Sequence, residues 1–367
     1  MSYALSQLSE QVTTARANMH AVRIVGGNTK AFYGNPIEGE QPVTELEMAG
    51  LSGVVSYEPS ELVITALAGT RLADIEAVLA KEGQMLAFDP PSFGATSTIG
   101  GVVASGLSGP LSFGYGAARH FVLGAHLLDA QGRILKFGGE VMKNVAGYDV
   151  SRLLAGSLGM FGVIVQVSLK VMPVAKCDMT LHFEMSEAQA LDFCAGLRAK
   201  AMPIRAAAWQ TEPDGHAGEL AVRLCGADSA VQHAAQALGG QTMAADLAHD
   251  WWRGLRDQQS LAFAARPLWR LAVAAQTPQL GLPSCAFDMG GEVRWLVAPH
   301  ADAPEVREMA RQAGGHATLF RAAPDDAWPA DGVFEPLAAP NRAIVQRLKR
   351  EFDPMAIFNP GRLVAGI

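Results

Sequence analysis

Three stretches rich in glycine and hydroxyl groups could hold an anionic ligand with main-chain atoms. The first is GGNTK at residues 26–30, which directly follows the apolar segment 21–25. A strand that runs into Gly-Gly is the layout of a phosphate-holding turn, although GGNTK matches neither the Walker A motif nor the dinucleotide fingerprint. An ordinary tight turn is the alternative, and it is the commoner structure for an isolated Gly-Gly pair.

The second stretch, residues 90–124, contains eight glycines, and no charged residue lies between Asp89 and Arg119. Its repeated glycines and Pro110 argue against a membrane-spanning helix. Glycine lets main-chain N–H groups approach a ligand closely, and Ser and Thr hydroxyls add donors. We therefore expect backbone that lies flat against an anion such as a pyrophosphate. A glycine-rich surface loop is the alternative.

The third stretch places Gly156, Gly159 and Gly162 at steps of three. It lies between a predicted short helix at 149–154, capped by Asp149, and a predicted strand at 163–171. These glycines could approach the same ligand, or they could relieve crowding between a helix and a sheet. The residues alone favour neither interpretation.

Composition excludes several classes of function. The chain has 367 residues, a net charge of -7 and no basic run, which disfavours a nucleic-acid partner. Its length suggests two or three domains, and its 49% hydrophobic content supports a sizeable core. Four scattered cysteines without a CxxC pair fit a reducing compartment and argue against zinc or iron–sulfur ligation. Since neither a secretory signal nor a membrane span is evident, we expect a cytoplasmic protein with no direct membrane insertion.

The hydrophobic pattern predicts strands and helices whose arrangement changes near residues 173–176. Before this boundary we expect a helix at 2–18, strands at 51–57 and 62–68, a hairpin at 122–137, and a helix at 70–82 capped by Thr70. After it we expect strands at 179–185, 219–225, 269–275, 284–289 and 293–299, and helices at 187–200, 229–238, 304–313 and 341–351. Four tryptophans of this later half are interface anchors or, more commonly, core aromatics: Trp251, Trp252, Trp269 and Trp295.

Several motifs, in order along the chain, resemble the FAD-linked oxidases of the vanillyl-alcohol oxidase superfamily, which carry a PCMH-type FAD-binding domain. They are IVGGNTK, then AFDPP with STIGG and GYGAARHFVLGA, then AGYDVSRLLAGSLGMFGVI, then FDPMAIFNPGRLV. Within this superfamily the chain is most similar to the E-type subunits of bacterial glycolate oxidases.

The resemblance implies an α+β fold with three parts. These are a PCMH-type FAD-binding domain of two subdomains at 1–175, an α+β cap domain at 176–335, and a C-terminal segment at 336–367 that returns to the FAD domain. It implies FAD bound non-covalently, because the first loop has no histidine for a covalent bond. The implied cofactor-binding residues are Val25, Gly26, Gly27, Asn28, Thr29, Lys30, Pro90, Thr98, Gly100, Gly101, Ala104, Gly106, Gly109, Gly159, Gly162, Val163, Ile164 and Asn359.

The resemblance also implies a function and partners. The chain would be the FAD-binding subunit of a glycolate oxidase/dehydrogenase complex, supporting oxidation of glycolate, a 2-hydroxy acid, to glyoxylate. Its partners would be a D-type FAD-linked catalytic subunit and an iron–sulfur subunit, which receive the electrons and make any contact with the inner membrane. A self-sufficient flavin-dependent 2-hydroxy-acid oxidoreductase is the main alternative, and a scaffold that has lost FAD is another.

Catalytic residues are harder to predict than cofactor-binding ones. The nine histidines show no HxxH or HExxH spacing, and the cap segment PSCAFDMGGEVRWLV has no histidine where D-type relatives carry a metal cluster, so no metal site is expected. Leu158 stands where related oxidases usually have Glu. Oxidation of a hydroxy acid needs a base or a metal to take the hydroxyl proton. His120 is the best single candidate for a base, although a packing role is commoner for a lone histidine.

Overall fold

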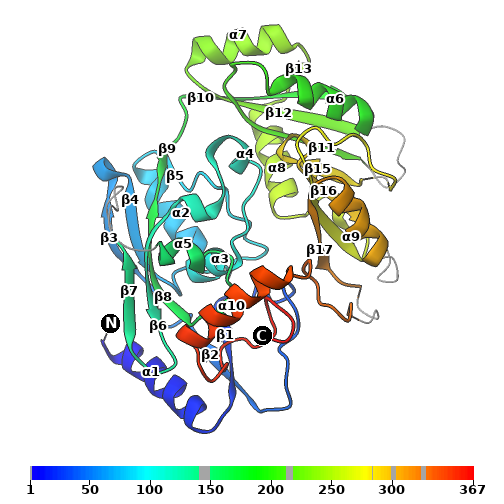
Figure 1. Cartoon of the computed structure of the whole chain (residues 1–367). Helices are drawn as coiled ribbons and strands as arrows, with labels where there is room; N and C mark the ends of the chain where they lie inside the picture. Colours follow the sequence, from blue (N-terminus) through cyan, green and yellow to red (C-terminus); the bar gives the residue numbers. More distant parts are fainter. Residues whose placement is uncertain (1, 140–148, 212–217, 283, 299–302, 324–327) are drawn as a thin grey trace.

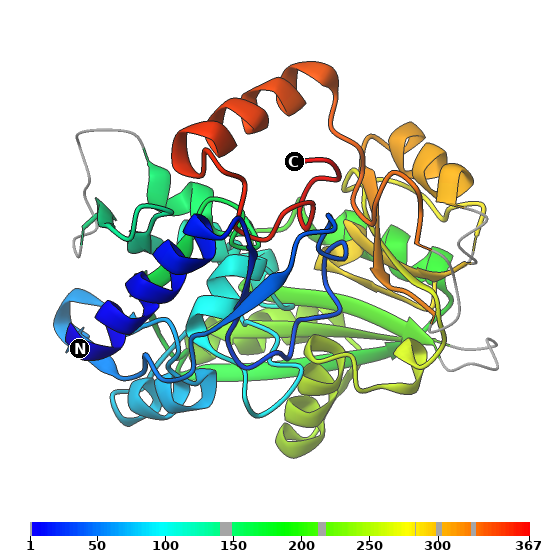
Figure 2. The ribbon, with the colours of Figure 1, turned by 90° about the horizontal axis from the view of Figure 1, so that it is seen from below.

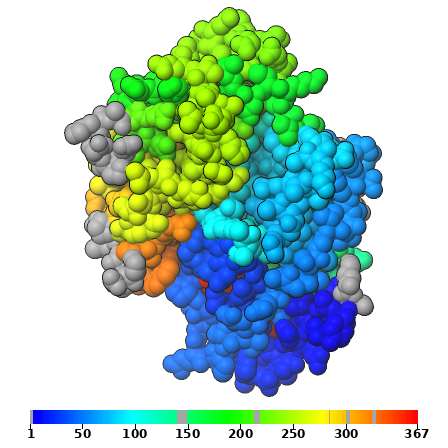
Figure 3. Space-filling model, turned by 180° about the vertical axis from the view of Figure 1, so that it is seen from behind, coloured from blue at the N-terminus to red at the C-terminus, as the bar shows by residue number. Residues whose placement is uncertain are grey.

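The computed structural model describes residues 2–139, 149–211, 218–282, 284–298, 303–323 and 328–367. An N-terminal half built on a five-stranded sheet lies beside a later half built on an eight-stranded sheet (Figure 1). Seen from behind, the two halves meet along a continuous seam (Figure 3). Within the described residues, no helix is both long and apolar enough to cross a membrane.

The five-stranded sheet has the antiparallel order β3-β4-β8-β6-β7. Helices α2, α3 and α5 cover one face, and α1 together with the parallel pair β1-β2 covers the other. Because successive side chains of a strand point to opposite faces, β8 sends Val163 and Val165 toward α1 and Ile164 toward the other helices. The strands are β1 (Ala21–Val25), β2 (Val43–Glu47), β3 (Val54–Glu58), β4 (Val63–Leu67), β6 (Val122–Leu128), β7 (Ile134–Gly138) and β8 (Val163–Lys170).

Apart from the 16-residue α1, the described helices of this half have ten residues or fewer. The helices are α1 (Ser2–Ala17), α2 (Leu72–Lys81), α3 (Ile99–Ser105), α4 (Ser112–Tyr115) and α5 (Val150–Leu154), and a small sheet joins β5 (Gln84–Met85) to β9 (Met172–Pro173). Helix α2 buries Leu72, Ile75 and Leu79 at helical spacing. The expected Thr70 cap is wrong: the N-cap is Arg71, and the Thr70 hydroxyl instead donates to the Leu67 carbonyl. The expected Asp149 cap of α5 is confirmed.

The eight-stranded sheet has the order β13-β10-β12-β11-β15-β16-β14-β17. Helices α6 (Glu187–Leu197), α7 (Asp228–Leu238) and α9 (Ala303–Gln312) cover its outer face, and α8 (Ala245–Arg256) packs on the inner face, which is turned toward the N-terminal half. The strands are β10 (Cys177–Glu184), β11 (Ile204–Thr211), β12 (Gly218–Gly226), β13 (Gln241–Thr242), β14 (Leu268–Ala272), β15 (Ala286–Asp288), β16 (Val293–Val297) and β17 (His316–Arg321).

After the sheet, the chain returns to the N-terminal half through α10 (Ala339–Phe352) and a tail, which lie together in Figure 2. Phe358 forms a parallel bridge with Val22 of β1 and is fully buried. The ammonium of Lys349 donates to the carbonyls of Met160 and Phe358 and to the Asp353 carboxylate, at 2.6–2.8 Å. These bonds fix the tail against the strand that leads into the first glycine-rich loop.

Most expected elements are present within a few residues of their predicted ends, whereas β2, β11, α8 and β17 were not expected. The second glycine-rich stretch was expected to be flat backbone, but part of it forms α3. Helix α3 tolerates its glycines because Gly100 packs against Ala68 with its amide donating to the Ala68 carbonyl at 2.8 Å. Trp252, Trp269 and Trp295 lie in the core rather than at the surface.

Candidate functional site

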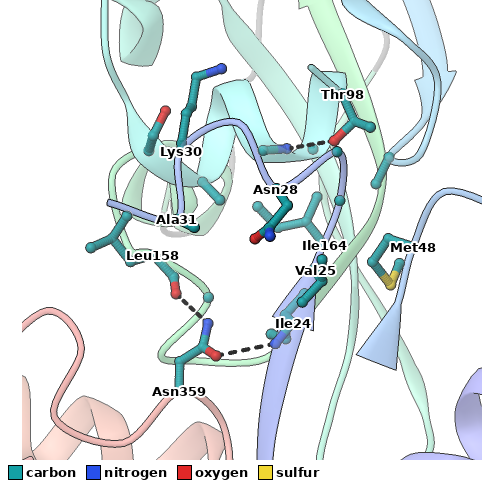
Figure 4. A pocket seen from close by; sticks show the side chains of 18 of the residues that line it. Ile24, Val25, Asn28, Lys30, Ala31, Met48, Thr98, Leu158, Ile164 and Asn359 are labelled. Atoms are coloured by element: carbon teal, nitrogen blue, oxygen red, sulfur yellow. Dashed lines mark hydrogen bonds between the residues drawn. The ribbon is translucent and has the colours of Figure 1, made fainter. Parts of the chain in front are cut away.

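The three glycine-rich stretches converge on one cavity in the N-terminal half (Figure 4). The cavity encloses about 860 Å³ including its open mouth. It lies at the end of β1, beside α3 and under the turn that precedes β8. The predicted residues that line it are Val25, Gly26, Gly27, Asn28, Thr29, Lys30, Thr98, Gly100, Gly101, Ala104, Gly159, Gly162, Ile164 and Asn359.

The first loop presents unused main-chain donors to this cavity. Asn28 has a left-handed φ of 58°, which turns the backbone sharply after Gly27. Within the described residues, the amide N–H groups of residues 26–29 donate no hydrogen bond. Successive free N–H groups in a turn of this kind form a concave site for anions.

Glycine is required in this loop because the second stretch lies directly against it. A Cβ on Gly27 would collide with the Thr96 carbonyl, and a Cβ on Gly26 would collide with the Thr98 hydroxyl. The Thr96 hydroxyl also donates to the Gly27 carbonyl at 2.7 Å. The loop and α3 are therefore held in one fixed arrangement.

Lys30 ties the same two segments together from the other end of the loop. Its ammonium donates to Ser97 Oγ at 2.8 Å and to the Ser92 carbonyl at 3.2 Å. Burial lowers the pKa of Lys30 to about 8, although the nearby Asp257 carboxylate acts in the opposite direction.

Helix α3 begins at the cavity wall. The Thr98 side chain caps it and accepts the Gly101 amide at 3.3 Å. A Cβ on Gly101 would meet only Thr98 Oγ1, at 3.3 Å, so this glycine leaves open space facing the cavity. The pair Gly100–Gly101 thus serves two needs, close packing on one side and room for a ligand on the other.

Asn359 joins the C-terminal tail to the third stretch. Its Nδ2 donates to the Leu158 carbonyl at 2.6 Å, and its Oδ1 accepts the Ile24 amide at 3.2 Å (Figure 4). Gly159, with φ 73°, has space for no side chain, because a Cβ there would lie 2.9 Å from both Asn359 Nδ2 and Ile24 Cδ1. The tail is therefore a structural wall of the cavity.

Four predicted binding residues lie outside this cavity. Pro90 is buried, Gly109 packs against Asp89 and Arg256, and Val163 belongs to the core beneath α1. Gly106 lines a second cavity, which also contains His120. Sequence reasoning missed further residues that line the first cavity: Arg23, Ile24, Ala31, Met48, Ala68, Ser105, Leu158 and Arg362.

The second cavity adjoins the first at Ser105, which lines both. It lies between the N-terminal half, strands β14 and β17, and the C-terminal region that includes α10. His120 is exposed here, at the end of a short 3-10 helix. Among the described residues, no group of three or more His, Cys, Asp or Glu side chains is placed to hold a metal ion.

The residues of the first cavity fit a dinucleotide cofactor. They offer free amides for a pyrophosphate, an open surface at Gly101, and apolar contacts from Val25, Met48 and Ile164.

Comparison with known protein families matches residues 5–138 to the FAD binding domain. The chain is 41% identical to the glycolate oxidase subunit GlcE of Escherichia coli, over 98% of this chain and 97% of the relative. It is 32% identical to the glycolate oxidase subunit GlcD of Bacillus subtilis, over 36% of this chain and 28% of that protein. A D-lactate dehydrogenase of Archaeoglobus fulgidus is 34% identical over 31% of this chain and 25% of its own length.

A solved structure of alkyldihydroxyacetonephosphate synthase superposes on 96% of this chain and 74% of its own length, with a TM-score of 0.67. At 15% identity, this likeness concerns the fold.

Proposed function

Because this chain belongs to the family of the glycolate oxidase subunit GlcE and carries an FAD binding domain, we propose that it is the FAD-binding subunit of a glycolate oxidase complex. The complex oxidises glycolate to glyoxylate. A GlcD-type subunit is the catalytic partner, and an iron–sulfur subunit receives the electrons. The observation that carries the proposal is the meeting of three glycine-rich stretches at one cavity, where the amides of residues 26–29 have no acceptor within the described chain.

FAD, when bound, would carry electrons between the GlcD-type subunit, where glycolate is oxidised, and the iron–sulfur subunit. The residues of this chain bind and orient it. The amides of the first loop and the open face at Gly101 receive the pyrophosphate, and Ile164 and Met48 supply apolar contacts. Asn359 and Lys30 hold the walls in place. The binding is non-covalent.

Gly101→Val tests this site. The added side chain would occupy the open face, so we expect the bound FAD per chain to fall at least about tenfold, since losing even one charge-assisted hydrogen bond costs roughly 1.5–3 kcal/mol. Bound flavin is measured from the visible spectrum after desalting. Glycolate oxidation by the reconstituted complex should fall with it.

Gly196→Val is the matched control. Gly196 also lies in a helix, and a Cβ added there would meet no atom within 4 Å, but this glycine is remote from the cavity. The control variant should fold and retain FAD. If both variants retained FAD equally, the cofactor would bind elsewhere and the proposal would fail.

A second candidate function is a self-sufficient 2-hydroxy-acid oxidoreductase. The observation that favours it is the second cavity beside Ser105, which contains Arg270, an arginine with no ionic partner among the described residues. Reduction of the flavin of the isolated chain by glycolate distinguishes the two functions.

A further inference from the structure

The second cavity is large enough to take a ligand of its own. The volume accessible to water is about 1150 Å³, close to the upper limit of the roughly 300–1,000 Å³ of a typical small-molecule site. Its walls come from segments far apart in the sequence, including Tyr33 after the first loop, strands β14 and β17, and α10.

The last two strands of the eight-stranded sheet, β14 and the edge strand β17, present a block of side chains to this cavity. In the antiparallel register of β14 and β17, Arg270 lies opposite Thr318 and Ala272 lies opposite His316. Directly opposed residues share a face of a sheet, as do residues two apart on one strand, so all four point to the same side. That side carries the inner-face core and is turned toward the N-terminal half.

Arg270 brings a positive charge to this block. Its guanidinium forms neither a hydrogen bond nor an ion pair with any described residue, and its close partner in the described chain is the ring of Trp295, with 6.0 Å between Cζ and the ring centroid. It is only partly exposed to solvent. Its charge acts on the buried Asp288 carboxyl, but the two side chains form no ion pair within the described residues, so its five N–H donors remain free to match another carboxylate.

Tyr33 adds a second donor to the cavity. Its ring is fixed by Phe320 and Phe334, each with a centroid 5.3 Å away, while its hydroxyl makes no hydrogen bond within the described chain. Burial raises the pKa of Tyr33, and the charge of Arg270 acts in the opposite direction. The hydroxyl therefore stays protonated and able to donate at neutral pH.

Other charged groups also line the cavity. Asp331 and Glu335 line it as well, and their carboxylates are paired with Arg307 and Arg311. Burial and the charge of Arg270 lower the pKa of His316, so the imidazole is neutral at pH 7 and adds no positive charge. Arg119 and Arg342 also line the cavity, but Arg119 is exposed and Arg342 donates to the Ala365 carbonyl at 2.9 Å. Arg270 is therefore the partly buried lining arginine that has no hydrogen-bond partner among the described residues.

We infer that the second cavity binds the carboxylate of a small monocarboxylic acid, with Arg270 as its ionic partner and the Tyr33 hydroxyl as a second donor. The negative charge of the ligand follows from Arg270 and the Tyr33 hydroxyl, while its small size and its identity as a 2-hydroxy or 2-oxo acid rest on the proposed function. This chain would then contact the acid that the complex consumes or releases, in addition to holding FAD.

The test uses 2-hydroxy-2-methylpropanoate as a probe. This acid has no hydrogen on C2, so it can bind but cannot be oxidised. It is titrated into the full FAD-loaded chain by calorimetry at constant ionic strength. We expect saturable 1:1 binding that Arg270→Gln weakens at least about tenfold, the effect of losing one charge-assisted bond.

Arg119→Gln is the matched control, because Arg119 lines the exposed mouth of the same cavity. It should weaken binding less than about threefold, the size expected for an exposed charge. The uncharged analogue 2-hydroxy-2-methylpropanamide, titrated into the unaltered chain, should not bind. This arm keeps the test decisive even if Arg270→Gln fails to fold.

Equal binding of acid and amide, equal losses in the two arginine variants, or no binding of the acid to a chain with full FAD content would each overturn the inference. The last result would leave the proposed function intact. Binding of the acid by a chain that cannot take up FAD would instead support the inference and remove the proposed function.

Discussion

Asp288 is a carboxyl group buried where the eight-stranded sheet meets the N-terminal half. It is 9% exposed, and its Oδ1 accepts the Met289 amide at 2.6 Å. Burial raises the pKa of Asp288 to about 7, with the charge of Asp89 acting in the same direction, while the Met289 amide and Arg270 oppose the shift. Its protonation state therefore affects the free energy of unfolding.

Asp288→Asn should alter the pH dependence of stability. An unfolded aspartate titrates near pH 4. The native state keeps its proton up to about pH 7. Between these values the native state binds more protons, so this group's contribution to stability is complete below pH 4 and is lost as the pH rises through 7. The amide cannot ionise but can still accept the Met289 N–H. We expect the free energy of unfolding of the variant, from urea titration, to exceed that of the parent chain at pH 8 by on the order of 1–3 kcal/mol, and to match it near pH 4.5.

Asp250→Asn is the control, because Asp250 is exposed and its ionic partner in the described chain is the neighbouring Arg253. The same change in pH dependence from both variants would contradict the assignment to Asp288.

At the scale of single residues, sequence reasoning found the cofactor loops better than the ligand cavity. Gly26, Gly27 and Gly101 stand in dense glycine patterns that point to close backbone approach. Arg270, Tyr33 and His316 carry no such signal, since each is alone in its local sequence. Only the register of β14 with β17 and the packing of the two halves bring them together.

At the scale of elements, α8 connects the later half to the cofactor loops. Asp257, directly after α8, accepts the Ser92 amide at 2.7 Å, the Ser92 hydroxyl at 3.1 Å and the Phe93 amide at 3.4 Å. Arg256 bridges Asp257 and Asp89, at 2.9 and 3.4 Å. Because Lys30 donates to the Ser92 carbonyl, these contacts position the first loop from outside the cavity.

Asp257→Ala should therefore weaken FAD binding without touching the cavity. The substitution leaves the Ser92 and Phe93 amides without their acceptor, at a cost of about 1–3 kcal/mol. We expect the dissociation constant for FAD, measured by flavin fluorescence, to rise on the order of tenfold. Asp250→Ala, in the same helix but exposed, should leave it unchanged. An unchanged constant in Asp257→Ala would show that α8 does not support the loop.

Helix α8 itself could have been found from its strong amphipathic pattern, in which Ala248, Trp252 and Leu255 are buried at helical spacing. By contrast, α3 was not predicted, because glycine disfavours helices. Its formation depends on packing against Ala68 of the neighbouring segment. The sequence did not predict strand β2 either. β2 pairs with β1, and this pair packs against α1 and Phe358, which are distant in sequence.

At the scale of the whole molecule, the tail from Asp353 to Ile367 contributes residues to both cavities. It closes the first cavity through Asn359 and forms part of the second through Leu363, Val364 and Ala365. The motif FDPMAIFNPGRLV predicted that the tail returns to the N-terminal half. The three hydrogen bonds of Lys349 that hold the tail there could not be predicted from the sequence. Charge networks between distant segments depend on tertiary packing, which hydrophobic periodicity does not encode.

The most direct test of the proposed function is the reduction of this chain's flavin by glycolate without oxygen. The visible flavin bands are recorded for the FAD-loaded chain alone and then with an equal amount of a GlcD-type subunit. We predict that the bands persist in the chain alone and bleach in the mixture by more than the partner's own flavin accounts for. Bleaching of the chain alone, at the rate of the complete complex, would contradict the proposal and make the chain an oxidoreductase in its own right.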